Sequence, residues 1–198
     1  MASDFMLTLI RHLPTLANAE RRYIGWSDES IITPKKVFGQ PRRNPNTIYG
    51  SNLRRCHETA ALFYPNTPYL GMIAFREMNF GNWELKTYED LKADPLYQRW
   101  LSNPEVVSPP NGELFHEMGS RVLNGVKSLR EYDPVVVTHG GPIRYMLMQF
   151  APEVSDFWSW DVKHGDQWML RWASRQCFEE GKRCECLSVE RLMESEPM

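Results

Sequence analysis

Two histidines, several arginines and one glutamate follow short apolar runs in this sequence. An arginine pairs with phosphate oxygens through two parallel hydrogen bonds, and a neutral imidazole can attack phosphorus and carry the phosphoryl group covalently. A carboxylic acid beside them can protonate the departing alkoxide, which is otherwise a poor leaving group. These residue types are therefore suited to the transfer of a phosphoryl group. In chain order, the polar groups are Arg11-His12, Ser51-Asn52-Leu53-Arg54-Arg55, Glu77 and His139-Gly140-Gly141.

The apolar runs before these groups predict the strands of a mostly parallel sheet. Helical patterns lie between the runs, and this alternation predicts an α/β fold of three layers, with helices flanking both faces of the sheet. Ligands bind at the carboxyl ends of the strands in such sheets, so we expect the four polar groups to meet at one edge. The predicted strands are residues 5–10, 47–50, 69–75 and 135–138, and the predicted helices are 52–63, with Ser51 as N-cap, 113–132 and 143–150.

Proline positions and apolar spacing assign the remaining segments. Residues 87–101 are amphipathic, and Pro95 is expected to divide them into two short helices. Residues 167–172 and 186–189 predict two late strands that could form a hairpin. Residues 14–46 are a long polar excursion, whose basic side chains either form a solvated loop surface or steer an anionic substrate. These basic residues are Lys35, Lys36, Arg42 and Arg43.

The composition is that of an ordinary globular protein, with 42% hydrophobic and 24% charged residues. We expect a single domain over residues 1–198, with a small helical insert at about 84–118. The formal net charge of -2 argues against a nucleic-acid binder, and no apolar run approaches the ~18 residues that cross a membrane. The first residues predict a strand and not a signal peptide, so we expect a cytoplasmic protein. Its thiols are then expected to be reduced: Cys56, Cys177, Cys184 and Cys186.

Four segments of the chain resemble the signature segments of the histidine phosphatase superfamily, also called the phosphoglycerate mutase-like family. The family's first segment is an apolar strand followed by Arg-His-Gly-x-Thr, and its second usually reads Ser-x-Leu-x-Arg-Ala-x-Gln-Thr-Ala. The third segment carries an acidic residue, and the fourth carries a second histidine. The matching segments occur in the family's order within residues 7–150, and they are residues 9–15, 51–60, 76–84 and 137–141.

The resemblance implies a role for each matching residue. His12 would be the nucleophile that forms a phosphohistidine, and Glu77 would protonate the leaving group and then activate water. Arg55, and not Arg54, occupies the family's arginine position. No metal ion and no cofactor is expected, because arginines and histidines supply the positive charge. The implied catalytic residues are His12, Glu77, His139, Arg11 and Arg55, and the implied phosphate-binding residues are Arg11, Asn18, Arg55, His139 and Gly140 through its amide.

One position departs from the family pattern. The residue after the nucleophile is Leu13, where the family usually has glycine, and Pro14 follows it. A backbone carbonyl can still orient His12, because every residue has one. Pro14 has no N–H, so a phosphate contact through that amide is absent. The sequence thus leaves two outcomes for this loop, full activity or reduced activity.

The resemblance implies a phosphatase that acts on a small phosphorylated metabolite, with a homodimer as an option. The best-matching subgroup is the small bacterial one that contains alpha-ribazole phosphatase and broad-specificity phosphatases. Cofactor-dependent phosphoglycerate mutases are typically longer, so hydrolysis is favoured over a mutase reaction. A catalytically silent phosphate-binding module is a third interpretation, which Leu13 and Pro14 keep open. Glu84 is an alternative proton donor. Three aromatic residues either pack in the core or stack on the leaving group: Tyr88, Trp100 and Phe115.

Overall fold

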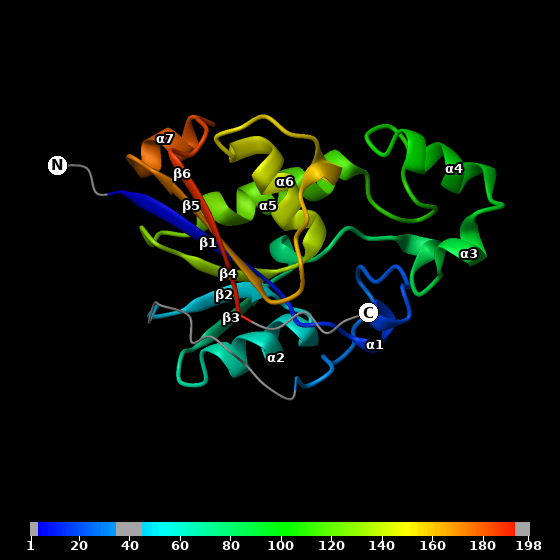
Figure 1. Ribbon diagram of the computed structural model, residues 1–198, viewed down its shortest axis with the longest axis horizontal. Coiled ribbons are helices and arrows are strands. Elements are labelled where there is room, and N and C mark those ends of the chain that lie inside the picture. Colours follow the sequence, from blue (N-terminus) through cyan, green and yellow to red (C-terminus); the bar gives the residue numbers. More distant parts are fainter. Residues whose placement is uncertain (1–3, 35–44, 193–198) are drawn as a thin grey trace.

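The computed structural model describes residues 4–34 and 45–192, which form a six-stranded sheet with helices on both faces (Figure 1). The strand order is β3-β2-β4-β1-β5-β6. The strands are β1 (Phe5–Arg11), β2 (Ile48–Ser51), β3 (Tyr69–Met72), β4 (Val135–Thr138), β5 (Asp166–Trp172) and β6 (Cys186–Arg191). The α-helices are α1 (Leu16–Ala19), α2 (Arg54–Phe63), α3 (Tyr88–Leu91), α4 (Pro95–Ser102), α5 (Phe115–Ser128), α6 (Gly140–Phe150) and α7 (Arg175–Glu179).

The first four strands run parallel to one another. Strand β4 pairs in parallel with β1 on one side and with β2 on the other, and β3 pairs in parallel with β2. Strand β5 runs antiparallel beside β1, and β6 runs antiparallel beside β5. The predicted mostly parallel sheet is therefore confirmed, and the residues that follow β1, β2, β3 and β4 leave the sheet at the same edge.

Apolar side chains on both faces of the central strands account for the three layers. Leu9 and Val136 are buried in the core that includes residues of α5 and α6. Their neighbours Ile10 and Val137 are buried in a second core that includes residues of α2. A strand that is apolar on both faces must be covered on both sides. Figure 1 shows α2 on one side of the sheet and α5 and α6 on the other, which confirms the predicted three-layer fold.

Two boundaries near the site differ from the prediction. Ser51 is not the N-cap of α2 but the last residue of β2, and Leu53 takes the N-cap position without a side-chain cap. The third strand does not reach Phe75, because it ends at Met72 and the chain makes a 3-10 turn. The hydroxyl of Thr138 donates a 2.7 Å hydrogen bond to the carbonyl of Phe75, which ties this turn to the end of β4.

Helix α5 is shorter than predicted, because it covers residues 115–128 of the expected 113–132. At its start, the Glu117 carboxylate accepts a hydrogen bond from the N–H of Leu114 and so caps the helix. At its end, Leu129 has extended backbone angles. Glu113 therefore lies in the loop before the helix, where its side chain is available to other segments.

The outer segments confirm some predictions and correct another. Pro95 begins α4 and Asp94 caps it, so the predicted division of residues 87–101 into two short helices is confirmed. Figure 1 shows α3 and α4 together beyond one end of the sheet. The late strands are neighbours, but α7 lies between them in the chain, so they do not form a simple hairpin. The single-domain extent and the insert boundaries stay predictions.

Some sequence observations concern residues without a described position. The basic residues Lys35, Lys36, Arg42 and Arg43 lie outside the described residues. Within the described ranges, none of the helices combines the length and the apolarity needed to cross a membrane.

Candidate active site

A cavity of about 240 Å³ lies at the carboxyl ends of the parallel strands. Four of the predicted site residues line it, namely Arg11, His12, Asn18 and Glu77. Tyr88 does not line this cavity and is 52% exposed. Aromatic side chains line much of the rest, and the residues concerned are Tyr23, Phe80, Trp100, Phe115, Phe157 and Trp158.

The imidazole of His12 is held through one of its two ring nitrogens, Nδ1. Its Nδ1 lies 2.6 Å from the carbonyl oxygen of Leu13 and must be the donor, because a carbonyl can only accept. The main-chain N–H of His12 donates a 2.9 Å hydrogen bond to the carbonyl of Thr138, which joins the loop to β4. In the neutral ring the available lone pair is therefore on Nε2. A nucleophilic role requires such a nitrogen, without a proton.

Leu13, in the place of the family's usual glycine, has a packing role. Its side chain is fully buried in the core beside α2, and its N–H donates a 2.9 Å hydrogen bond to the hydroxyl of Thr59. Leu13 is not among the described residues with positive φ, so the loop does not need a glycine there. The backbone carbonyl expected to orient His12 is that of Leu13 itself.

Arg11 brings an incompletely satisfied guanidinium to the cavity. Its Nη1 donates a 2.5 Å hydrogen bond to the carbonyl of Val162, whereas its buried Nε has no partner among the described residues. Burial, together with the nearby charge of Arg144, lowers the pKa of Arg11 to about 10, so the group stays cationic at neutral pH. A buried donor without an acceptor costs free energy, and an anion in the cavity would relieve this cost.

Arg55 and His139 lie behind the cavity wall and contact each other. Both are 0% exposed, and the Nε of Arg55 donates a 3.3 Å hydrogen bond to Nδ1 of His139. The other ring nitrogen of His139 lies 3.5 Å from the thiol of Cys56. The rings of His12 and His139 are 4.9 Å apart between centroids. The structure thus brings Arg55 and His139 close to His12. Both ring nitrogens of His139 already contact a partner, so a phosphate contact through His139 requires the ring to turn, or one nitrogen to contact both its partner and the phosphate.

Glu77 faces the same cavity from the segment after β3. Its carboxylate accepts hydrogen bonds of 2.9 Å from the N–H of Met78 and 2.9 Å from the N–H of Gly141, at the start of α6. A Cβ at Gly141 would lie 2.1 Å from a Glu77 carboxylate oxygen, so only glycine permits this approach. Glu77 therefore reaches the cavity although β3 is the edge strand farthest from β5 and β6.

The two supporting residues predicted for phosphate binding are Asn18 and Gly140. Asn18 lines the cavity, but its Oδ1 accepts from the N–H of Thr15 at 3.1 Å as part of the α1 cap. Its amide nitrogen is the atom that could donate to an anion. Gly140 opens α6, and a Cβ there would lie 3.3 Å from Cζ of Arg11. Asn18 is thus at the cavity, and Gly140 is next to Arg11, which lines it.

Two cationic or titratable residues of the site were not predicted. The Nδ1 of His164 donates a 2.9 Å hydrogen bond to the backbone carbonyl of His12, and the two rings are 5.1 Å apart. Arg144 lines the cavity, and its Nε donates to the carbonyl of Trp160. His164 lies two residues before β5, and an antiparallel strand begins at the edge where its parallel neighbours end. That topological signal could have identified it.

Metal coordination is not suggested by the side chains that have described positions. Within residues 4–34 and 45–192, no group of three or more histidine, cysteine, aspartate or glutamate side chains is arranged to hold a metal ion. The four cysteines, predicted as reduced thiols, are free.

The three histidines of the site share an environment that disfavours the imidazolium form. Burial is the largest cause, and it lowers the pKa of His12 and of His139 well below the ordinary range. Burial and the charge of Arg11 lower the pKa of His164 to about 3. His12 is therefore neutral at neutral pH, as a nucleophile must be.

These lowered pKa values predict that the protein loses stability in mild acid. Below pH ~6.5 the unfolded chain binds protons that the native state excludes, so the free energy of unfolding must fall as the pH falls. At pH ~5.5 the loss is about 1.4 kcal/mol for each such histidine, or about 4 kcal/mol for all three. Urea unfolding at pH 7.5 and at pH 5.5 measures this loss in the free energy of unfolding. The His164→Asn variant should lose about a third less, and an equal loss in both proteins would contradict this origin.

The sequence profile of the histidine phosphatase superfamily (branch 1) matches residues 7–181. The chain belongs to this superfamily. No curated protein sequence matches the chain significantly.

Several solved structures resemble the fold of this chain over most of their length. The alpha-ribazole phosphatase from Shigella flexneri is 21% identical, with a TM-score of 0.71, over 94% of this chain and 95% of that chain. YhfR from Bacillus stearothermophilus is 27% identical, with a TM-score of 0.72, over 85% and 93%. A Thermus thermophilus protein, TTHB049, is 26% identical, with a TM-score of 0.66, over 86% and 95%. The predicted phosphoglycerate mutase-like fold is confirmed, and superfamily membership supports an enzyme with phosphatase or mutase-like activity.

Proposed function

We propose that this chain hydrolyses phosphate monoesters through a phosphohistidine at His12. One observation carries the proposal: the Leu13 carbonyl holds the Nδ1–H of His12, which leaves Nε2 unprotonated, and the cavity that His12 lines is also lined by Arg11 with its unpartnered Nε. A nucleophile and a phosphate-binding cation then meet in one cavity. Arg11 and Arg55 neutralise the phosphate so that a neutral imidazole can approach it, and no metal ion is needed.

The reaction has two steps with the same residues. In the first, Nε2 of His12 bonds to phosphorus as the bond to the leaving oxygen breaks, and Glu77 gives its proton to that oxygen. The hydrogen bond to the Leu13 carbonyl stabilises the positive charge that develops on the ring. In the second, water attacks phosphorus, Glu77 takes back a proton, and the electron pair of the N–P bond returns to Nε2.

The cavity favours a small organic phosphate as substrate. Its aromatic lining can cover an apolar or planar leaving group, and Trp158 is 62% exposed beside it. Trp100 and Phe115 line the cavity as the sequence analysis allowed. We include alpha-ribazole 5'-phosphate among the test substrates, because the Shigella flexneri protein of similar fold is named an alpha-ribazole phosphatase. Cytoplasmic location and a homodimer stay predictions.

The test is to trap the covalent intermediate. The protein is mixed with a set of ³²P-labelled phosphomonoesters, quenched in alkali and digested, and the labelled peptide is identified. We expect label on His12 that is stable to alkali and lost in acid, together with release of inorganic phosphate that excess chelator does not reduce. Label on another residue, or phosphate release without any label, would contradict the proposal. An exchange assay primed with bisphosphoglycerate separates hydrolysis from a mutase reaction.

A further inference from the structure

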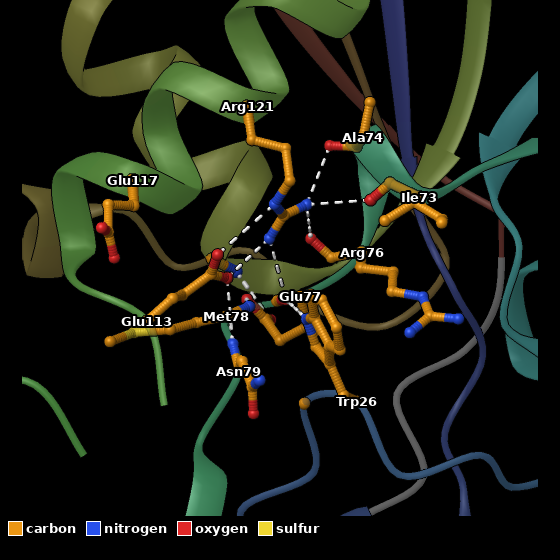
Figure 2. Close-up of polar contacts among 12 residues, drawn as sticks. Trp26, Ile73, Ala74, Arg76, Glu77, Met78, Asn79, Glu113, Glu117 and Arg121 are labelled. Atoms are coloured by element: carbon orange, nitrogen blue, oxygen red, sulfur yellow. Dashed lines mark hydrogen bonds and ion pairs between the residues drawn. The ribbon is translucent and has the colours of Figure 1, made fainter. Parts of the chain in front are cut away.

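Four backbone carbonyls of the segment that leads to Glu77 converge on the guanidinium of Arg121 in α5 (Figure 2). Its Nη1 lies 3.1 Å from the carbonyl oxygen of Ile73, 2.9 Å from that of Ala74 and 3.0 Å from that of Arg76. Its Nη2 lies 3.2 Å from the carbonyl oxygen of Glu77. Nη1 has only two N–H groups for three carbonyls, so at least one of them is shared between two acceptors, while Nη2 donates to the carbonyl of Glu77.

Arg121 is itself held by Glu113, the residue that stays outside the helix. Nη2 of Arg121 lies 2.6 Å from Oε1 of Glu113, and the two side chains are only 18% and 14% exposed. The same carboxylate oxygen accepts a 3.0 Å hydrogen bond from the N–H of Asn79. This ion pair, which we term the Arg121–Glu113 clamp, therefore fixes the chain on both sides of Glu77.

Glu77 is held at its backbone and at its carboxylate by different parts of the protein. The indole N–H of Trp26 donates a 3.0 Å hydrogen bond to the same Glu77 carbonyl that Arg121 contacts. Cζ of Arg76 lies 4.7 Å from the centroid of the Trp26 ring, which adds a cation–π contact to this arrangement. The carboxylate is held by the N–H of its neighbour Met78 and, from α6, by the N–H of Gly141. His12 is held by the carbonyls of Leu13 and Thr138, so a change at the clamp would move the backbone of Glu77 while the nucleophile stays in place.

We propose that Arg121 is a positioning residue for the acid–base step. This inference rests on the proposed function, in which Glu77 protonates the leaving oxygen. Arg121 does not line the cavity, so it acts through the backbone of residues 73–77. Proton transfer needs a heavy-atom separation of about 2.6–3.2 Å, and a misplacement of about 1 Å can cost roughly 100-fold in rate. Loss of the clamp should therefore affect the substrates that need a proton most.

The test compares two substrates that differ in their need for a general acid. Arg121→Met should lower kcat/KM for an alkyl phosphate such as glycerol 2-phosphate roughly 10- to 100-fold, and for p-nitrophenyl phosphate less than about 3-fold. In a Glu77→Gln background the same change should cost less than about 2-fold on the alkyl phosphate, because residues that act through one another are not additive. Arg121→Lys should restore part of the loss.

Arg175 provides a matched control, since it makes the same kind of contacts elsewhere. It pairs with Glu179 at 2.8 Å and donates to the carbonyls of Lys127 and Glu131, and it does not line the cavity. Arg175→Met should leave kcat/KM unchanged for both substrates. Equal losses on both substrates for Arg121→Met, or an undiminished further loss in the Glu77→Gln background, would show that Arg121 only supports the fold and would overturn the inference.

A second variant covers the case in which Arg121→Met does not fold. Glu113→Gln keeps an acceptor at the clamp and removes its charge, so it should again reduce the alkyl phosphate rate more than the p-nitrophenyl phosphate rate. No difference between the substrates would overturn the inference. Failure of the proposed function looks different, because the wild-type protein would then carry no label on His12 in the trapping experiment.

Discussion

Replacement of His12 by alanine is expected to lower phosphate release by at least about 10³-fold and to abolish the labelled intermediate. The side chain provides the only imidazole among the described residues that lines the cavity. Its Nε2 would form the bond to phosphorus, and no neighbouring side chain in the cavity offers an equivalent nucleophile. The measurement is kcat/KM for the best substrate of the trapping set, with labelled protein counted in parallel.

The fold should survive this substitution. His12 is 3% exposed, but it borders the cavity, so water can occupy the space that the ring leaves. We expect the free energy of unfolding to change by less than about 2 kcal/mol. The control is His57→Ala, an exposed histidine of α2, which should keep wild-type turnover. If His12→Ala keeps more than a few per cent of the activity, the nucleophile is another residue.

Glu77→Gln is expected to separate substrates by their leaving groups. The loss of kcat/KM should be about 10²- to 10⁴-fold for alkyl phosphates and less than about 10-fold for p-nitrophenyl phosphate, whose leaving group needs little protonation. kcat/KM reports the steps up to the cleavage of the ester bond, so it isolates the donor role from the later activation of water. With p-nitrophenyl phosphate the variant should also show a burst of nitrophenol, because hydrolysis of the intermediate is slowed.

Glu84, the alternative donor, provides the comparison for this prediction. Its two carboxylate oxygens accept hydrogen bonds from four backbone N–H groups, which belong to Gly25, Trp26, Ser27 and Phe80. This carboxylate therefore supports the loop whose Gly25 and Ser27 carbonyls accept hydrogen bonds from Arg55. Glu84→Gln should consequently lower kcat/KM by the same factor for both substrates. Equal losses on both substrates for Glu77→Gln would remove Glu77 from the donor role.

The sequence by itself determined the central part of this protein. The run Val135-Val136-Val137-Thr138 is apolar on both faces, and it is the buried strand β4 with the predicted boundaries. The rule that ligands bind where parallel strands end placed Arg11, His12 and His139 together, because β1 and β4 are adjacent and parallel. Periodicity and strand polarity are local properties, so the chain itself carries this information.

Only the tertiary structure decided how the remaining groups meet. Glu77 follows an edge strand, and it reaches the cavity because the Arg121–Glu113 clamp, Trp26 and Gly141 redirect its segment. His164 enters from the turn before β5, an antiparallel strand whose partner β1 is far away in the sequence. Both arrangements depend on hydrogen bonds between distant residues, which are 44 positions apart for Arg121 and Glu77, 64 for Gly141 and Glu77, and 152 for His164 and His12. Such contacts leave no periodic signal in the sequence, since they form only when the layers pack.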